Sequence, residues 1–166
     1  MRRILAVLAL TAVVLSPAAE AKEKSKAKAA KSELTLTDVN SCLALNNATP
    51  EEQIAACTKV LNSGQIKKGF DGEYYASRAA AYTAIREYDE ALADLNKALL
   101  TRQTPEIYFQ RALLYIGTAD AEAGKKDLDK VLSLKPGFAA AHLLRGAISY
   151  RQADYKAALV DFEAAV

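Results

Sequence analysis

The stretch Arg78-Ala79-Ala80-Ala81-Tyr82 decides the fold of this chain, because it returns twice at a nearly fixed interval. It recurs as Arg111-Ala112-Leu113-Leu114-Tyr115 and then as Arg145-Gly146-Ala147-Ile148-Ser149-Tyr150. The three arginines are separated by 33 and then by 34 residues. A period of this length is typical of a repeat array, in which each unit packs only against its neighbours.

Each unit contains two segments in which small and large apolar residues recur at helical spacing. In the unit that holds Tyr82 these residues are Tyr75, Ala79 and Tyr82, followed by Ala91, Leu95 and Ala98. The polar stretch Arg86-Glu87-Tyr88-Asp89 separates the two segments. Short side chains at Ala79 and Ala91 would let two antiparallel helices approach closely. Thr104-Pro105 and Lys135-Pro136 stand where the second helix of a unit must end.

This pattern resembles the tetratricopeptide repeat, a helix-turn-helix of about 34 residues. The resemblance implies an all-α fold, an α-solenoid wound as a right-handed superhelical array. We expect a repeat domain over residues 36–166, with units at approximately 36–64, 72–104, 105–138 and 139–166. Some positions depart from the family pattern. They are Gly124 and Val131 at small positions of the third unit, Ala121 at its turn aromatic, and Ser149 at an aromatic position of the fourth.

The first residues have the pattern of a secretory signal peptide. Arg2 and Arg3 precede the apolar run 4–15, and Ala19-Glu20-Ala21 fits the small-x-small rule for cleavage. We therefore expect residues 1–21 to be removed and the protein to act in the periplasm or outside the cell, with no stable membrane insertion after cleavage. An uncleaved membrane anchor is the alternative, although the run is short for a membrane span.

The charge balance argues against a nucleic-acid partner. Removing residues 1–21 would take away Arg2, Arg3 and Glu20 and lower the formal net charge from +2 to +1. A nucleic-acid binder needs a clear basic surplus on one face. The one basic stretch, within residues 22–35, has no aromatic residue for base stacking, so we interpret it as a flexible linker. Transient contact with anionic lipid or cell-wall polymer is the alternative.

Two cysteines, Cys42 and Cys57, fall in the two helices of the first unit. An exported chain meets an oxidising compartment, so we expect the pair to form a disulfide that stabilises the most degenerate unit. The alternative is two buried free thiols. With no histidine nearby, the pair is a poor zinc site.

The sequence indicates a non-enzyme without a catalytic, metal or cofactor site. His142 is the only histidine, stands where Tyr75 and Tyr108 stand in earlier units, and is expected to pack as a ring. Acidic residues such as Asp94, Asp127 and Asp129 lie among Lys and Arg, and we expect solvated helix faces there. Nothing selects a catalytic carboxylate pair, although a hydrolase accessory or a cryptic enzyme stays as a third hypothesis.

The resemblance implies a partner-binding groove, because in this family the first helices of successive units line the concave face. The residues expected to point inward are Ala76, Ala80, Thr83, Phe109, Leu113, Ile116, Leu143, Ala147 and Tyr150. Such an apolar strip on a protein surface marks a binding site for an apolar helix or segment. Packing between units is the alternative role for some of these residues. The strip lacks the Lys, Arg and Asn that clamp a carboxylate in some members of the family, so we do not expect recognition of acidic tails.

The leading hypothesis is an exported interaction scaffold or adaptor that holds a protein or peptide on its concave face. A periplasmic holdase-like chaperone with an apolar groove is the alternative. The last helix would carry an apolar face with Leu159, Phe162 and Val166, which predicts self-association through the C-terminal end or coverage by a partner. A chain that continues beyond Val166 would produce the same pattern.

Overall fold

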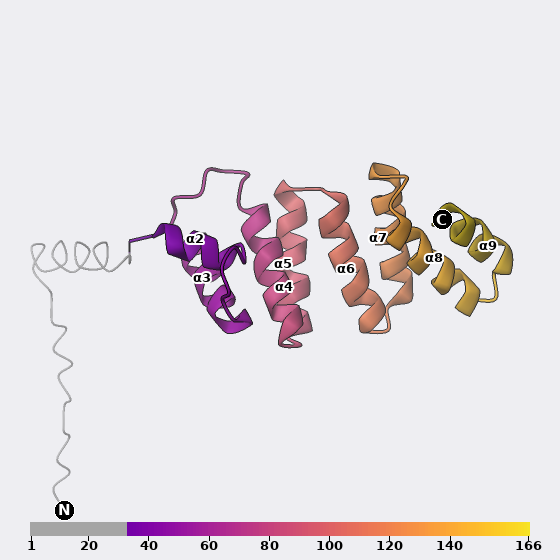
Figure 1. The fold of residues 1–166 in the computed structure, drawn as a ribbon, viewed down its shortest axis with the longest axis horizontal. Coiled ribbons are helices and arrows are strands. Elements are labelled where there is room, and N and C mark those ends of the chain that lie inside the picture. Colours follow the sequence, from indigo (N-terminus) through magenta and orange to yellow (C-terminus); the bar gives the residue numbers. More distant parts are fainter. Residues whose placement is uncertain (1–32) are drawn as a thin grey trace, which may run out of the picture. The chain divides into compact units, whose positions relative to one another are not determined.

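A computed structural model describes residues 33–166, which form eight α-helices arranged as successive antiparallel pairs (Figure 1). The pairs are α2 (Leu36–Cys42) with α3 (Pro50–Asn62), α4 (Gly72–Ala84) with α5 (Tyr88–Thr101), α6 (Pro105–Gly117) with α7 (Ala121–Leu134), and α8 (Ala139–Arg151) with α9 (Tyr155–Ala164). These described residues contain no β-strand. The prediction of an all-α repeat solenoid is confirmed.

The predicted signal peptide, residues 1–21, and most of the predicted linker 22–35 lie outside the described residues. Within residues 33–166, none of the helices combines the length and the apolar character needed to span a membrane.

Side-chain caps fix where most of these helices begin. Thr35 and Thr49 each form a capping box, with Asp38 and Glu52 respectively. Thr104 accepts a hydrogen bond from the backbone N–H of Ile107 and is followed by Pro105, whose missing N–H costs nothing in the first helical turn. The predicted break at Thr104-Pro105 therefore separates α5 from α6.

The turn inside each of the last three pairs uses a non-glycine residue in the left-handed region. Arg86, Ala119 and Ala153 have φ angles of 66°, 67° and 62° and stand at equivalent places in their units. The next residue precedes the second helix, and at Asp120 and Asp154 its side chain accepts a hydrogen bond from the backbone N–H three residues on. The left-handed turn therefore recurs with the same period as the sequence repeat.

Small residues permit the close helix contacts that the sequence predicted. A Cβ atom added at Gly124 of α7 would lie 2.7 Å from Cγ1 of Ile116 in α6. One added at Gly146 of α8 would lie 2.8 Å from Cε1 of Phe162 in α9. In the second unit, Ala79 and Ala91 are both fully buried at the same places. Glycine in the later units compensates for the bulk of Ile116 and Phe162.

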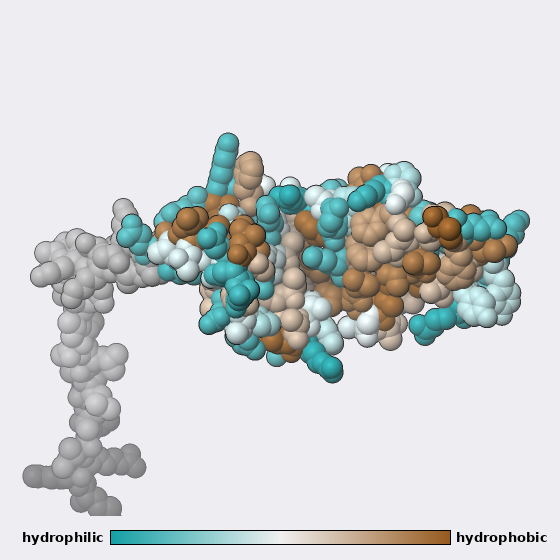
Figure 2. Space-filling model, viewed as in Figure 1, coloured by the Kyte–Doolittle hydropathy of each residue, from teal (hydrophilic) through white to brown (hydrophobic). Residues whose placement is uncertain are grey.

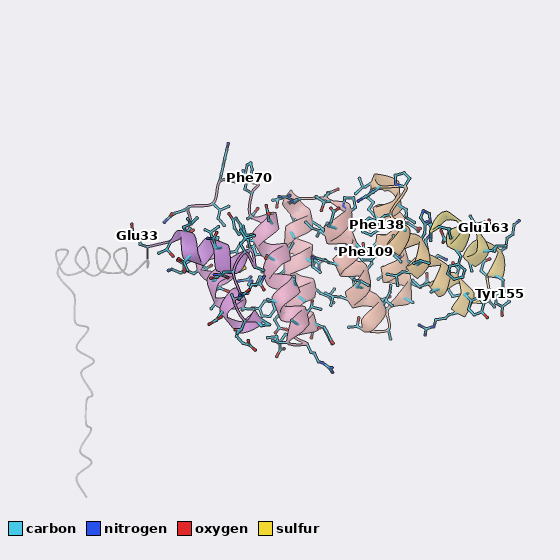
Figure 3. The ribbon with its side chains drawn as sticks, in the orientation of Figure 1. Glu33, Phe70, Phe109, Phe138, Tyr155 and Glu163 are labelled. Carbon is cyan, nitrogen blue, oxygen red and sulfur yellow. A yellow bond between two sulfur atoms is a disulfide. The ribbon has the colours of Figure 1, made fainter. Side chains whose placement is uncertain are left out.

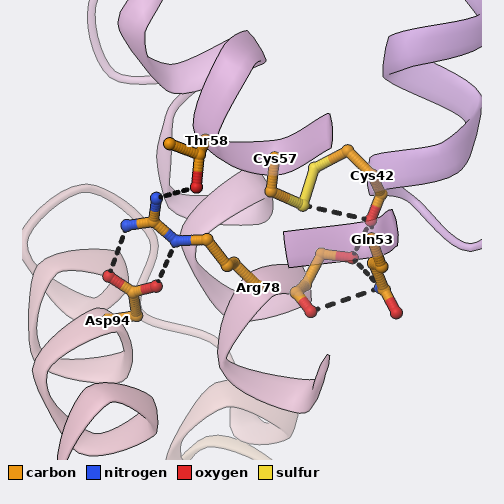
Figure 4. Close-up of a disulfide and its surroundings, with 7 residues drawn as sticks. Cys42, Gln53, Cys57, Thr58, Arg78 and Asp94 are labelled. Carbon is orange, nitrogen blue, oxygen red and sulfur yellow. Dashed lines mark hydrogen bonds and ion pairs between the residues drawn. A yellow bond between two sulfur atoms is a disulfide. The ribbon is translucent and has the colours of Figure 1, made fainter. Parts of the chain in front are cut away.

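The array has one core that runs from α4 to α8 and a separate small core between α2 and α3. The small core consists of Cys42, Ala56, Cys57 and Val60. Cys42 and Cys57 are joined by a disulfide across this pair of helices, as predicted (Figure 4). The covalent link therefore lies in the smaller of the two cores.

One expectation from the sequence is wrong: Asp94 and Asp127 are not solvated. They are 2% and 5% exposed, and Asp161 at the equivalent place of the fourth unit is 3% exposed. Each accepts two hydrogen bonds from the arginine sixteen residues earlier, which forms a buried ion pair between the two helices of a unit. The pairs are Arg78–Asp94, Arg111–Asp127 and Arg145–Asp161. Burial of a carboxylate is tolerated here because the guanidinium supplies both charge and fixed donors.

The same arginines also connect neighbouring units. The Nη1 group of Arg78 donates to Thr58 of α3, as Figure 4 shows. The Nη1 group of Arg111 donates to Asn96 of α5 at 2.6 Å, and that of Arg145 to Asp129 of α7 at 2.7 Å. Each arginine therefore joins its own pair of helices to the second helix of the preceding pair.

Candidate functional site

An apolar hollow on the face of the first helices lies between α4 and α6. It has a volume of about 350 Å³, and its lining includes Ala80, Thr83, Tyr88, Gln110, Leu113 and Thr118. The walls come from α4 and α6, while Tyr88 and the buried Leu95 belong to α5. The hollow is large enough for a bulky apolar side chain of a partner.

The structure divides the nine predicted groove residues into three groups. Ala80, Thr83 and Leu113 line the hollow between α4 and α6. Ala76, Phe109 and Ile116 are half-buried and pack against the main core, which is the alternative role considered for them. Leu143, Ala147 and Tyr150 are exposed on α8, with Leu143 and Tyr150 51% and 59% accessible.

Phe109 packs against another aromatic ring of the same chain. Its ring packs against the ring of Phe138 with centroids 4.9 Å apart, and both are labelled in Figure 3. This contact joins α6 to the residue that precedes α8. The ring of Phe109 therefore contributes to packing within the array.

Exposed apolar side chains continue beyond the hollow. On the face seen in Figure 2, hydrophobic residues gather over α6 to α8, whereas hydrophilic residues are more frequent over α2 to α5. Leu113 of α6 is 46% exposed and Leu143 of α8 is 51% exposed, whereas other apolar residues of the same two helices are buried in the core. An exposed apolar surface of this kind favours contact with another molecule.

Gln110 of α6 lines this hollow and has one buried side-chain oxygen. Its Oε1 atom is inaccessible to water and has no hydrogen-bond partner within the described residues. A buried acceptor without a partner costs free energy. The sequence analysis did not include Gln110 among the groove residues, although Gln110, Leu113 and Gly117 share one helix face by their spacing.

His142 packs as a ring, as expected, but it also takes part in the polar contacts of the fourth unit. Its Nδ1 atom lies 2.9 Å from Oδ1 of Asp161, and its Nε2 atom lies 2.9 Å from the carbonyl oxygen of Pro136. Burial would raise the pKa of Asp161, but hydrogen bonds from Arg145 and His142 outweigh burial and lower this pKa. In the part of the chain that the structure describes, no three His, Cys, Asp or Glu side chains are grouped so that they could hold a metal ion.

A family model for the tetratricopeptide repeat matches residues 105–138, which comprise α6, α7 and the turn that follows. Residues 105–138 are therefore similar to a tetratricopeptide repeat. The helix pairs on either side of this repeat carry the same arrangement of small residues, left-handed turn and buried ion pair. The array as a whole therefore has the architecture of tetratricopeptide repeat proteins.

Among curated proteins, ethylene-overproduction protein 1 of Arabidopsis thaliana is 36% identical over 64 residues, which are 39% of this chain and 7% of that protein. The chain spans a fifth or less of the length of the curated relatives that it matches. The crystal structure of MamA has a TM-score of 0.64 and 21% identity over 70% of this chain and 66% of MamA. The second tetratricopeptide domain of Spaghetti, solved with an HSP90 peptide, has a TM-score of 0.55 and 17% identity over 58% of this chain and 91% of that domain. These likenesses show a shared fold.

Proposed function

We propose that this chain is an exported interaction scaffold that binds a protein or peptide on the concave face formed by α4, α6 and α8. The observation that carries this proposal is the apolar hollow between α4 and α6, with Leu113 half-exposed at its wall. The exposed residues Leu143 and Tyr150 extend the apolar surface along α8. A partner segment that crosses the three helices would cover all of them.

The mechanism is the presentation of a preformed surface. Because buried ion pairs and close helix contacts fix each unit to the next, the hollow exists before a partner arrives. Binding to a preformed surface avoids the entropy cost of ordering the scaffold. A solved tetratricopeptide domain with the same fold holds an HSP90 peptide, which supports a peptide or protein as the class of partner here.

The chemistry of the hollow favours an apolar segment over an acidic tail. Its lining is dominated by Ala79, Ala80, Leu113 and Leu114, and it contains no lysine or arginine among the described residues. A carboxylate would lose its hydration there without gaining a cation. The peptide SRMEEVD, bound by the Spaghetti domain, is therefore a suitable negative probe for this chain.

The test is a capture experiment with the exported protein, the Leu113→Glu variant and the Leu100→Glu variant. Leu100 of α5 is 83% exposed and lies outside the hollow, so it controls for the added charge. A discrete partner that is lost with Leu113→Glu and kept with Leu100→Glu supports the scaffold. Capture of many unrelated proteins, all reduced to a similar extent by Leu113→Glu, would favour the holdase-like chaperone. Equal capture by all three proteins would contradict binding at this face.

Export and self-association belong to the same proposal and need separate measurements. Sequencing the N-terminus of the protein purified from the cell envelope would give a start at residue 22 if the signal peptide is cleaved.

Leu159 and Val160 of α9 are 59% and 60% exposed, which supports contact between two copies through this helix. Light scattering of the wild type and of Val160→Glu would show a dimer only in the wild type, and a wild-type monomer would contradict that contact.

A further inference from the structure

The fourth unit lacks an aromatic ring that the second and third units keep over their ion pairs. Arg78 lies 5.8 and 5.9 Å from the ring centroids of Tyr75 and Tyr82. Arg111 lies 5.8 Å from each of the rings of Tyr108 and Tyr115. In the fourth unit, Ser149 takes the place of Tyr82 and Tyr115, four residues after Arg145. The guanidinium of Arg145 has lost the ring on that side.

A pocket of about 440 Å³ opens at this position. Arg145, Ser149 and Asp161 line it together with Lys125, Ala157 and Val160 from α7 and α9. The second unit has a cleft at the equivalent place. Among the described residues, Tyr82 lines this cleft, whereas the ion pair Arg78–Asp94 does not. In the fourth unit the ion pair Arg145–Asp161 lines the pocket.

The accessibility of the arginines agrees with this difference. The side chain of Arg145 is 26% exposed, against 13% for Arg78 and 20% for Arg111. Arg145 donates from Nε and Nη2 to Asp161 and from Nη1 to Asp129, so the two carboxylates hold the edge of the guanidinium. Its flat face is perpendicular to these bonds, and flat cationic faces stack on aromatic rings.

We propose that this pocket binds a tyrosine side chain of a partner protein, which stacks on Arg145 as Tyr82 and Tyr115 stack on Arg78 and Arg111. The chain itself shows that the local geometry accepts a phenol ring, because it builds the same contact twice. The pocket is formed by α7, α8 and α9, so it is distinct from the hollow between α4 and α6. Three cations and three carboxylates line it, and their charges balance, which disfavours a simple anion site.

The test uses p-cresol, the tyrosine side chain, as the probe and the Nε–H resonance of Arg145 in the full chain as the readout. An aromatic ring over a guanidinium shifts this proton upfield, and the Arg78 and Arg111 resonances serve as internal references for the stacked state. We expect p-cresol to move the Arg145 resonance saturably towards those references. The Ser149→Tyr variant should reach that position without p-cresol and should lose the response.

Two further variants keep the outcome interpretable. Ser133→Tyr places a tyrosine on an exposed part of α7 outside the pocket and should respond as the wild type does. Ala157→Leu narrows the pocket from α9 and should weaken the response even if Ser149→Tyr does not fold. The proposal is overturned if p-cresol leaves Arg145 unchanged, if Ser149→Tyr or Ala157→Leu responds fully, or if inorganic phosphate produces the saturable shift instead. These outcomes do not depend on whether the hollow near Leu113 binds a partner.

Discussion

Arg111 and Asp127 form a buried, two-point ion pair, with Nε 2.7 Å from Oδ2 and Nη2 2.8 Å from Oδ1. The hydrogen bonds that Arg111 donates to Asp127 raise the pKa of the Arg111 guanidinium above its ordinary value and outweigh its burial. Because Nη1 of Arg111 also donates to Asn96, this one side chain holds together α5, α6 and α7. The concave surface keeps its shape through contacts of this kind.

Removing one partner of this pair is expected to cost more than removing an exposed charge. Asp127→Asn should lower the free energy of unfolding by about 3 kcal/mol, because it leaves a largely buried guanidinium without its counter-charge. Asp129→Asn, two positions later, removes a half-exposed carboxylate that pairs with Arg145 and should cost at most about 1 kcal/mol. Urea denaturation followed by circular dichroism would measure both. Similar losses for the two variants would contradict the role of the buried pair.

Reduction of the disulfide should destabilise the first unit selectively. Cys42 and Cys57 are separated by 15 residues, and closing a loop of this length stabilises by about 3 kcal/mol in the chain-entropy model. The small core between α2 and α3 has little apolar surface to offset the loss. Hydrogen exchange with and without dithiothreitol should show faster exchange in α2 and α3 and little change in α6 and α7. If exchange in α2 and α3 does not change, the disulfide does not stabilise the first unit. As a control, the Cys42→Ser/Cys57→Ser protein should show the same exchange with and without dithiothreitol.

A missing helix cap offers a stabilising substitution. Asp120 and Asp154 accept hydrogen bonds from the backbone N–H groups of Ala123 and Ala157 at 3.0 and 3.1 Å, whereas Glu87 at the equivalent place makes no such bond. Glu87→Asp should therefore raise the free energy of unfolding by about 0.5–1 kcal/mol. Thermal denaturation would measure it against Glu90→Asp, which shortens a neighbouring exposed side chain without creating a cap. An equal effect of both substitutions would point away from capping.

The ion pair between α2 and α3 should make the first unit sensitive to acid. The hydrogen bond from Lys59, together with those from Thr35, lowers the pKa of Asp38 from 3.8 to about 2. Because the folded state lowers this pKa, the stabilisation is fully present above about pH 4 and is lost as the pH falls towards 2. The difference in melting temperature between the wild type and Asp38→Asn should be largest near pH 6 and should vanish near pH 2. A difference that is independent of pH would exclude this contribution.

Much of the fold could be predicted because its determinants recur in the sequence. The period of Ala79, Ala112 and Gly146, with the prolines between units, is enough to predict the helix pairs. The buried ion pairs were missed, because the sixteen-residue separation of Arg78 and Asp94 is not a pattern within one helix. A signal was present nonetheless: Arg78, Arg111 and Arg145 keep register with Asp94, Asp127 and Asp161. Charges that recur in register with a core pattern belong to the packing between helices.

The candidate site was only partly predictable, because its outline depends on helix rotation. Leu113 and Phe109 lie on one face of α6 by spacing, yet Leu113 borders the hollow while Phe109 stacks on Phe138. Phe138, 29 residues further along the chain, decides this difference, and no local pattern predicts it. Likewise, the exchange of tyrosine for Ser149 was visible in the sequence, but the pocket over Arg145 follows only from the positions of α7 and α9.

The most direct test of the proposed function is site-specific photo-crosslinking in intact cells. A photoreactive amino acid at position 110, inside the hollow, is compared with one at position 100, which is 83% exposed on α5. The proposed function predicts a discrete adduct from position 110, absent from position 100 and abolished by Leu113→Glu. An adduct that forms equally from both positions, or only from position 100, would contradict binding on the concave face.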